Sequence, residues 1–244
     1  MYTSSMTLLN ERFNYTPINR ESVEGKRLYA TPDGSKVPSV TTILDKTKPE
    51  EKKAALAAWK KRVGEVKAQE IVTEAAGRGT RMHKFLEDFC LTDQLNDPGT
   101  NPYSVQSHKM AKTIITNGMC NVNEVWGVEV PLYYPGLYAG TTDCCGIHST
   151  AEAIIDYKQT NKPKKKEWID DYFIQLCAYA LAHNELHGTK IRKGVIMMCV
   201  KPSEIGKTMT WSEPEYQEFI LEGAEFDKYT QQWWDRVELY FKNN

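Results

Sequence analysis

The chain has 244 residues, of which 41% are hydrophobic and 26% charged; this balance excludes a disordered chain or a coiled coil and predicts a globular protein. Its 31 basic and 32 acidic residues nearly cancel, so net charge alone identifies no polyanionic partner. The longest apolar run has the size of a strand, and the N-terminus lacks the pattern of a secretory signal. We therefore expect a soluble, cytoplasmic protein.

The six cysteines show no C-x-x-C spacing. Cys144 and Cys145 are adjacent in a predicted strand, and side chains alternate along a strand, so these two would point to opposite faces of the sheet. The pattern favours reduced, buried thiols over a zinc or iron–sulfur site.

The first 75 residues predict an arm followed by helices. The turn residues Pro32-Asp33-Gly34 predict an irregular arm or hairpin, and Ser39 has the position of an N-cap for a short helix. A longer helix is predicted from Pro49 to Ala75 because its apolar residues recur near one face. These residues are Leu56, Trp59, Val63, Val66 and Ile71.

The middle of the chain alternates between helical and β-rich patterns. The predicted elements are helices at 79–90 and 105–116, strands at 125–133, 137–147 and 152–159, a helix at 168–185 and a strand at 193–201. The three consecutive strands read as an antiparallel meander with short turns. The order helix, three strands, helix, strand predicts one mixed α/β core.

The segment Ser212-Glu213-Pro214-Glu215 has the spacing of a capping box, and it predicts one long helix through Tyr240. We therefore expect a single domain over 1–244. It would consist of an N-terminal arm with helices at 1–75, a catalytic core at 76–201 and a helical extension at 202–244.

An acid and a lysine end the apolar strand Ala153-Ile-Ile-Asp-Tyr-Lys158. Side chains at i and i+2 share a face, so Asp156 and Lys158 point into one site. Asp143 lies on the preceding strand, where hairpin pairing brings it close to Asp156. Two carboxylates at a strand end suit Mg²⁺ or Mn²⁺, and the lysine could orient a metal-bound water. An isolated D-x-K is also typical of an ordinary ion pair.

Further polar residues occur on the predicted helices. His83 could be another metal ligand, although a single histidine is more often a core residue. Arg78 and Arg81 could contact phosphate or lie in solvent. Gln175 and Tyr179 share a helix face and could reach the site, although such a pair is also typical of a helix surface.

The loop after the D-x-K strand is basic, with lysines at positions 162, 164, 165 and 166. A DNA backbone could approach there, although charged runs are usually solvated surface. Trp168, Tyr172 and Trp59 could stack unpaired bases. Alternatively, Trp59 and Tyr172 belong to apolar helix stripes.

Four spaced motifs occur in a fixed order: G-x-x-x-H at 79–83, G-x-x-D at 140–143, D-x-K at 156–158 and Q-x-x-x-Y at 175–179. This ordered set resembles the RecB-like branch of the PD-(D/E)XK nuclease superfamily. The stretch from Pro38 to Val200 also resembles the mitochondrial genome maintenance exonuclease group and its phage relatives. Unlike the iron–sulfur relatives in this branch, the chain has no assignable four-cysteine cluster.

The resemblance implies a restriction-endonuclease-like fold and a Mg²⁺- or Mn²⁺-dependent DNA exonuclease that acts on single-stranded or free ends, in the host cytoplasm if the protein is viral. It implies that His83, Asp143, Asp156 and the Tyr157 carbonyl bind metal and that Lys158 assists the attacking water. Gln175 and Tyr179 would organise the site or hold the strand. Glu129, on the strand before Asp143, is a weaker candidate for a further carboxylate.

Two alternatives remain open from the sequence. One is a non-catalytic module on the same fold that binds nucleic-acid ends or a recombination partner. The other is a metal enzyme that acts on small phosphate esters. The pair of acids with a lysine argues against a binding module, because binding a phosphodiester does not require carboxylates beside it.

Overall fold

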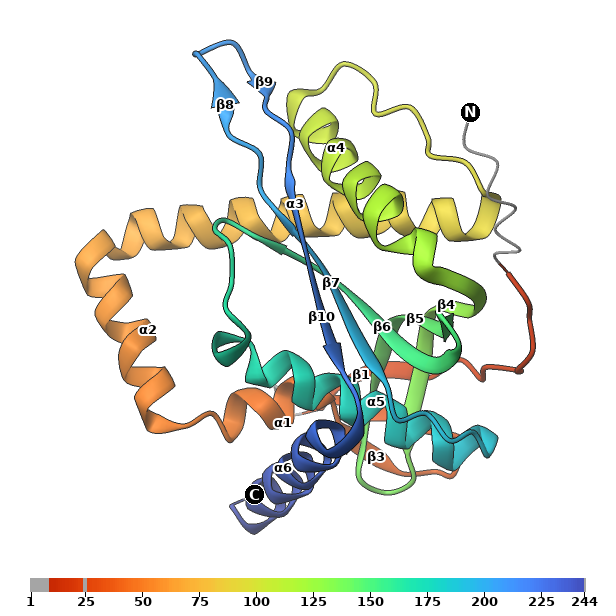
Figure 1. Ribbon diagram of the computed structural model, residues 1–244. Helices are drawn as coiled ribbons and strands as arrows, with labels where there is room; N and C mark the ends of the chain where they lie inside the picture. The colour runs from red at the N-terminus through yellow and green to blue at the C-terminus, as the bar shows by residue number, and fades with distance from the viewer. Residues whose placement is uncertain (1–8, 24–25, 244) are drawn as a thin grey trace.

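The computed structural model describes residues 9–23 and 26–243. At its centre is a five-stranded mixed sheet with the strand order β10-β7-β6-β5-β4 (Figure 1). All neighbouring strands are antiparallel except β6 and β7, which are parallel. The strands are β4 (Val122–Tyr134), β5 (Tyr138–His148), β6 (Ala151–Thr160), β7 (Gly194–Val200) and β10 (Glu215–Leu221).

Helices cover both faces of the sheet and enclose two apolar cores. One face packs against α3 (Glu65–Thr92) and α4 (Pro102–Asn117), and the other against α1 (Val40–Lys46), α5 (Asp170–His187) and α6 (Gly223–Lys242). Cys144 lies in the first core and Cys145 in the second, as strand alternation predicts. The order α3, α4, β4, β5, β6, α5, β7 contains the predicted sequence of a helix, three strands, a helix and a strand, and confirms the restriction-endonuclease-like core.

The N-terminal segment is more regular than expected. Strands β1 (Asn19–Val23), β2 (Lys26–Ala30) and β3 (Lys36–Pro38) form a small antiparallel sheet. The predicted turn at 32–34 joins β2 to β3. The Ser39 hydroxyl accepts a hydrogen bond from the Thr42 amide at 2.9 Å, which caps α1 as predicted.

The predicted helix boundary near residue 76 is wrong. Helix α2 (Glu50–Val63) ends at Gly64, whose φ is +89°, and α3 then continues without a break for 28 residues. The apolar stripe noted in this region is not part of either core. Leu56 is 45% exposed and Val66 is 77% exposed, and no residue of α2 is buried. In Figure 1, α2 stands at the side of the molecule, away from the sheet.

The predicted long C-terminal helix is wrong in its first part. Residues 215–221 form β10, which pairs with the free edge of β7, and α6 begins only at Gly223. Backbone pairing with β7 overrides the local capping pattern. A short hairpin of β8 (Glu204–Ile205) and β9 (Thr210–Trp211) precedes it. The expected helical extension is therefore a hairpin, a strand and a helix.

Short 3₁₀ turns complete the structure: η1 (Met119–Asn121) leads into β4, and η2 (Lys166–Trp168) leads into α5. Over the described ranges, none of the helices combines the length and the apolar character that crossing a bilayer requires.

Candidate active site

Strands β5 and β6 separate in the middle of the sheet, and the two predicted aspartates lie at this fork. The ladder between the strands ends at the pair Cys144–Ile155. Figure 1 shows β6 continuing beside β7 and away from β5. Just beyond the last pair, Asp143 Oδ2 accepts a hydrogen bond from the Tyr157 amide at 2.7 Å. The Asp143 side chain thus replaces the missing strand partner of Tyr157, and Asp156 is the residue immediately before Tyr157.

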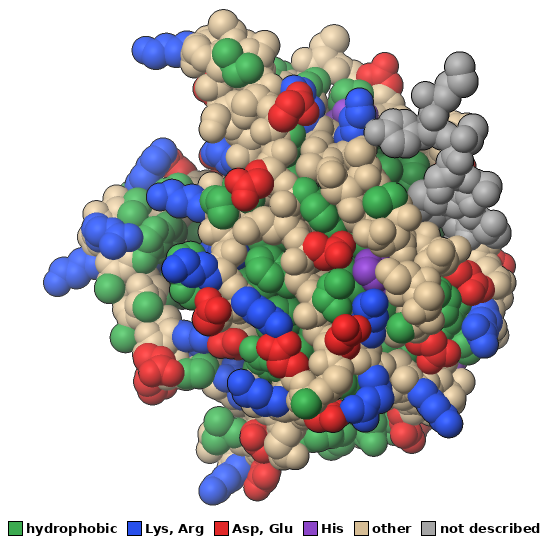
Figure 2. Space-filling model, viewed as in Figure 1, with side chains coloured by type: hydrophobic (Ala, Val, Ile, Leu, Met, Phe, Trp, Pro, Cys, Tyr) green, Lys and Arg blue, Asp and Glu red, His purple; other side chains and the backbone are tan. Residues whose placement is uncertain are grey.

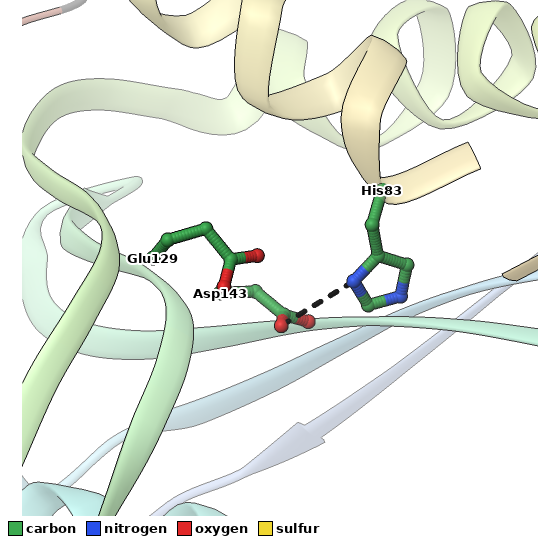
Figure 3. A group of neighbouring side chains, drawn as sticks. All are labelled: His83, Glu129 and Asp143. Carbon is green, nitrogen blue, oxygen red and sulfur yellow. Dashed lines mark ion pairs between the residues drawn. The ribbon is translucent and has the colours of Figure 1, made fainter. Parts of the chain in front are cut away.

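His83 reaches the fork from α3, and Glu129 reaches it from β4 (Figure 3). His83 Nδ1 lies 3.4 Å from Asp143 Oδ1, and the ligand atoms of His83, Glu129 and Asp143 all lie within 4.8 Å of one another. His83 lies within a long helix, not near the helix start that the sequence predicted. Three elements therefore bring together three side chains of types that can bind a metal ion.

Glu129 has a left-handed backbone, with φ +49°. This conformation is uncommon for residues other than glycine, and it clusters at functional sites. The flanking pairs Val128–Cys144 and Val130–Thr142 place Glu129 opposite Asp143. Sequence reasoning gave Glu129 little weight because it belongs to no motif; its only signal was an acid on the strand before Asp143.

Asp156 and Lys158 form an ion pair on the same face of β6. Burial raises the pKa of Asp156 to about 6, and the nearby charge of Asp143 adds to this effect. Burial alone would lower the pKa of Lys158, but the carboxylates of Asp156 and Asp143 hold it above its ordinary value. Lys158 Nζ also lies 5.0 Å from the centre of the Tyr172 ring. Lys158 is therefore an ammonium group at neutral pH.

The pKa of Asp143 moves in the opposite direction from that of Asp156. Burial would raise it, but contact with His83, the charge of Lys158 and the Tyr157 amide together lower it. Environments that separate the pKa values of two neighbouring carboxyls are typical of catalytic sites.

The Q-x-x-x-Y motif packs against the G-x-x-D motif. Gln175 Nε2 donates to Tyr179 Oη at 3.4 Å, and Tyr179 is buried. A Cβ atom on Gly140 would lie only 2.8 Å from Tyr179 Oη, so glycine at this position leaves room for the phenol. Burial raises the pKa of Tyr179, and the charges of Asp156, Lys158 and Asp143 also act on it. The two motifs thus meet beside the fork.

The predicted DNA contacts are not all available to a ligand. Lys162 and Lys165 are exposed, and Lys165 Nζ lies 5.5 Å from the centre of the Trp168 ring. Trp168 is 61% exposed. Lys166 instead forms a 2.6 Å ion pair with Glu225.

Three further residues that were predicted to contact DNA are half-buried and lie on different elements. Lys164 is half-buried, with its backbone held by Gln217. Arg81 is half-buried beside the Tyr103 ring, and Trp59 is half-buried on α2. Around α2, at the left of Figure 2, Lys and Arg side chains lie among hydrophobic ones.

The side chain of Arg78 is buried, whereas a DNA contact requires an exposed side chain. The residue is 1% exposed, and its guanidinium is engaged by Gln159, Glu74 and Asn161. The prediction that it contacts phosphate is therefore wrong. The sequence placed Arg78 near the start of a helix, whereas it lies in the middle of α3, on the side that faces β6.

The core order, and the acids and lysine at the β5–β6 fork, agree with the resemblance to the PD-(D/E)XK nuclease type that the motifs indicate. No protein-family model matches the chain. The chain is similar to mitochondrial genome maintenance exonuclease 1 of Mus musculus, with 26% identity over 215 residues, covering 84% of this chain and 59% of the relative. The corresponding exonuclease of Xenopus tropicalis is 28% identical over 179 residues, covering 68% of this chain and 49% of the relative. The chain thus spans between about half and three-fifths of the length of these relatives.

Two solved structures also resemble the chain. A putative exonuclease from Eubacterium rectale has a TM-score of 0.45 and 16% identity, and the match covers 70% of this chain and 65% of the exonuclease chain. A phage-related exonuclease from Haemophilus somnus has a TM-score of 0.34 and 12% identity, covering 66% of this chain and 79% of its own.

Proposed function

We propose that the chain is a metal-dependent deoxyribonuclease that hydrolyses phosphodiester bonds from DNA ends, with a preference for single strands. One observation carries this proposal: Asp143 and Asp156 lie at the β5–β6 fork beside His83 and Lys158. The similarity to proteins named exonucleases supports the same reaction.

The donor set of the fork fits a hard divalent cation. Carboxylate oxygens from Asp143 and Asp156, the Tyr157 carbonyl and the imidazole of His83 are ligands that Mg²⁺ or Mn²⁺ accepts. Glu129 offers a further carboxylate from the open side of the fork. Burial raises the pKa of Asp156, which means that burial disfavours the charged carboxylate. A cation bound beside Asp156 would offset this free-energy cost. When bound, the metal would supply charge for water activation and for the phosphate oxygens.

We assign to Lys158 the role of a hydrogen-bond donor. An unperturbed lysine is an ammonium group at neutral pH, and an ammonium group is a poor base because it has no lone pair to accept a proton. The Nζ of Lys158 would instead orient the attacking water or stabilise charge that develops on the phosphate. Asp156 holds this ammonium group from two residues away on the same strand. Gln175 and Tyr179 would organise the wall of the site beside Gly140.

The strand would approach along the loop after β6. Exposed Lys162 and Lys165 supply charge for the backbone there, and Trp168 offers a ring for stacking an unpaired base. Stacking is worth about 1–3 kcal/mol per base and tolerates any sequence. These features favour a single strand over a duplex, because the bases of a duplex are already stacked on one another.

The test is a cleavage assay with Mg²⁺ or Mn²⁺ on end-labelled single-stranded, duplex and circular DNA, and on a mononucleotide ester. The proposal expects metal-dependent release of nucleotides from linear single strands and little cleavage of circles. DNA-end binding without cleavage at any metal concentration would instead favour the non-catalytic module. Hydrolysis of only the mononucleotide ester would favour an enzyme of small phosphate esters.

A further inference from the structure

Arg78 is a buried cation on α3, and each of its three guanidinium nitrogens donates at least one hydrogen bond to a neighbouring side chain. Its Nε and Nη2 donate to Gln159 Oε1 at 2.9 and 2.7 Å, and Nη1 donates to Glu74 Oε1 at 3.0 Å. Nη2 also donates to Asn161 Oδ1. Burying a charge is costly unless its hydrogen bonds are made. Because the buried charge needs these hydrogen bonds, Arg78 holds the side chains of Gln159, Glu74 and Asn161 in fixed positions.

The contacts of Arg78 join two separate elements. Glu74 lies one turn earlier on α3, whereas Gln159 and Asn161 belong to β6 and the loop after it. Gln159 Nε2 in turn donates to the Ala75 carbonyl of α3 at 3.1 Å. The Gln159 amide therefore accepts from a side chain of α3 and donates to its backbone. A Cβ atom on Gly79 would lie 3.5 Å from Gln159 Cγ, so helix and strand are in close contact here.

This contact lies where β6 lacks a strand on one side. The ladder with β5 ends at Ile155, whereas the ladder with β7 continues to Thr160. Over the described residues, the stretch of β6 from Asp156 onward thus has a strand partner on the β7 side alone. Arg78, through Gln159, ties this half-supported stretch to α3. Lys158 is the residue immediately before Gln159, and α3 also carries His83.

We infer that Arg78 is a positioning residue that fixes the end of β6, and with it Lys158, relative to the His83 helix. The inference rests on the proposed nuclease function. Gln159 points toward α3, and Lys158 points to the opposite face, so Arg78 does not touch the reacting atoms. It acts through the backbone of β6. A displacement of a catalytic group by about 1 Å can lower a rate by about 100-fold.

The test compares Arg78→Lys and Gln159→Met with the wild type. Lysine keeps the charge of Arg78 but cannot make the forked contact with Gln159 and Glu74. The control is Arg192→Met, which removes an exposed arginine paired with Asp227 at 2.6 Å. Three quantities are measured: the thermal midpoint, amide hydrogen exchange along β6, and kcat and KM on a single-stranded oligonucleotide with saturating Mn²⁺.

We expect both variants to remain folded at the assay temperature. Exchange of the amides after Ile155 should accelerate by about tenfold or more, while exchange in β4 stays as in the wild type. kcat should fall by about 10- to 100-fold with KM within about threefold. Arg192→Met should match the wild type in kcat and in exchange along β6.

Three results would overturn the inference. A raised KM with unchanged kcat would make Arg78 a DNA contact. A lower thermal midpoint with unchanged kcat would make it a structural residue alone. Unchanged exchange after Ile155 would show that Arg78 does not hold β6. If Arg78→Lys fails to fold, Gln159→Met decides the matter. If the wild-type protein cleaves no DNA, the proposed function fails, and the exchange measurement alone decides whether Arg78 holds the strand.

Discussion

The β5–β6 fork and helix α2 are opposite exceptions to the usual distribution of residues, in which charged side chains are exposed and apolar side chains are buried. At the fork, charged side chains are buried: Asp156 is 3% exposed and ion-paired with Lys158. On α2, apolar side chains face solvent, and Leu56 is 45% exposed. Buried charges and exposed apolar residues are the informative exceptions in a folded protein. The fork is held by specific contacts between charged groups, whereas α2 contributes little to the core.

The largest effect is expected at the fork. Asp156→Asn keeps the shape of the side chain but removes the negative charge that the proposed function assigns to metal binding. kcat should fall by about a thousandfold or more, which corresponds to the several kcal/mol that metal activation supplies. Steady-state cleavage of a single-stranded oligonucleotide measures this, and circular dichroism checks that the variant is folded. Substantial remaining activity in pure Asp156→Asn protein would remove Asp156 from the proposed site.

A matched pair of leucines tests the contrast in burial. Leu86 is fully buried on α3, one turn after His83, whereas Leu56 is exposed on α2. Leu86→Ala should lower the free energy of unfolding by about 2–5 kcal/mol, and Leu56→Ala should change it by less than about 0.5 kcal/mol. Urea denaturation measures both. Equal losses would mean that α2 packs in the core after all.

Metal should stabilise the fork without DNA. Mn²⁺ at about 100 times its dissociation constant should add about 2.7 kcal/mol to the free energy of unfolding, because the ion binds the native site alone. Asp143→Asn should lose most of this gain. Thermal denaturation with and without Mn²⁺ provides the comparison, and Leu56→Ala serves as a control that keeps the full gain. A full gain in Asp143→Asn would make this acid purely structural.

The smallest effect concerns the loop after β6. Replacing exposed Lys162 and Lys165 by alanine should weaken DNA binding equally for all sequences. Each lost phosphate contact should lower the slope of log K against log salt by about 0.7 for single strands. Fluorescence anisotropy at several salt concentrations measures the slope, with exposed Lys242→Ala at the far end of α6 as the control. An unchanged slope would show that these lysines are ordinary solvated surface residues that do not contact DNA.

Local sequence determined the order of the core elements and the placement of the two aspartates. Asp156 and Lys158 share a face because side chains alternate along any strand. The short turn between β5 and β6 pairs them in a hairpin, and this brings Asp143 beside Asp156. The separation of Cys144 and Cys145 between two cores follows from the same alternation. These features depend on residues that are close in the chain, so they can be predicted from the sequence.

Tertiary structure alone decided the features that depend on distant partners. The apolar stripe of α2 is real, but periodicity says nothing about whether another element covers it. Residues 215–221 became a strand because the edge of β7 was free for pairing. Arg78 is buried because Gln159 and Asn161, more than 80 positions later, satisfy its guanidinium. Glu129 joins the site only because β4 pairs with β5 in the register that sets it opposite Asp143. For β10, Arg78 and Glu129, the deciding free energy comes from a contact that has no local signature in the sequence, and for α2 it is the lack of such a contact that decides.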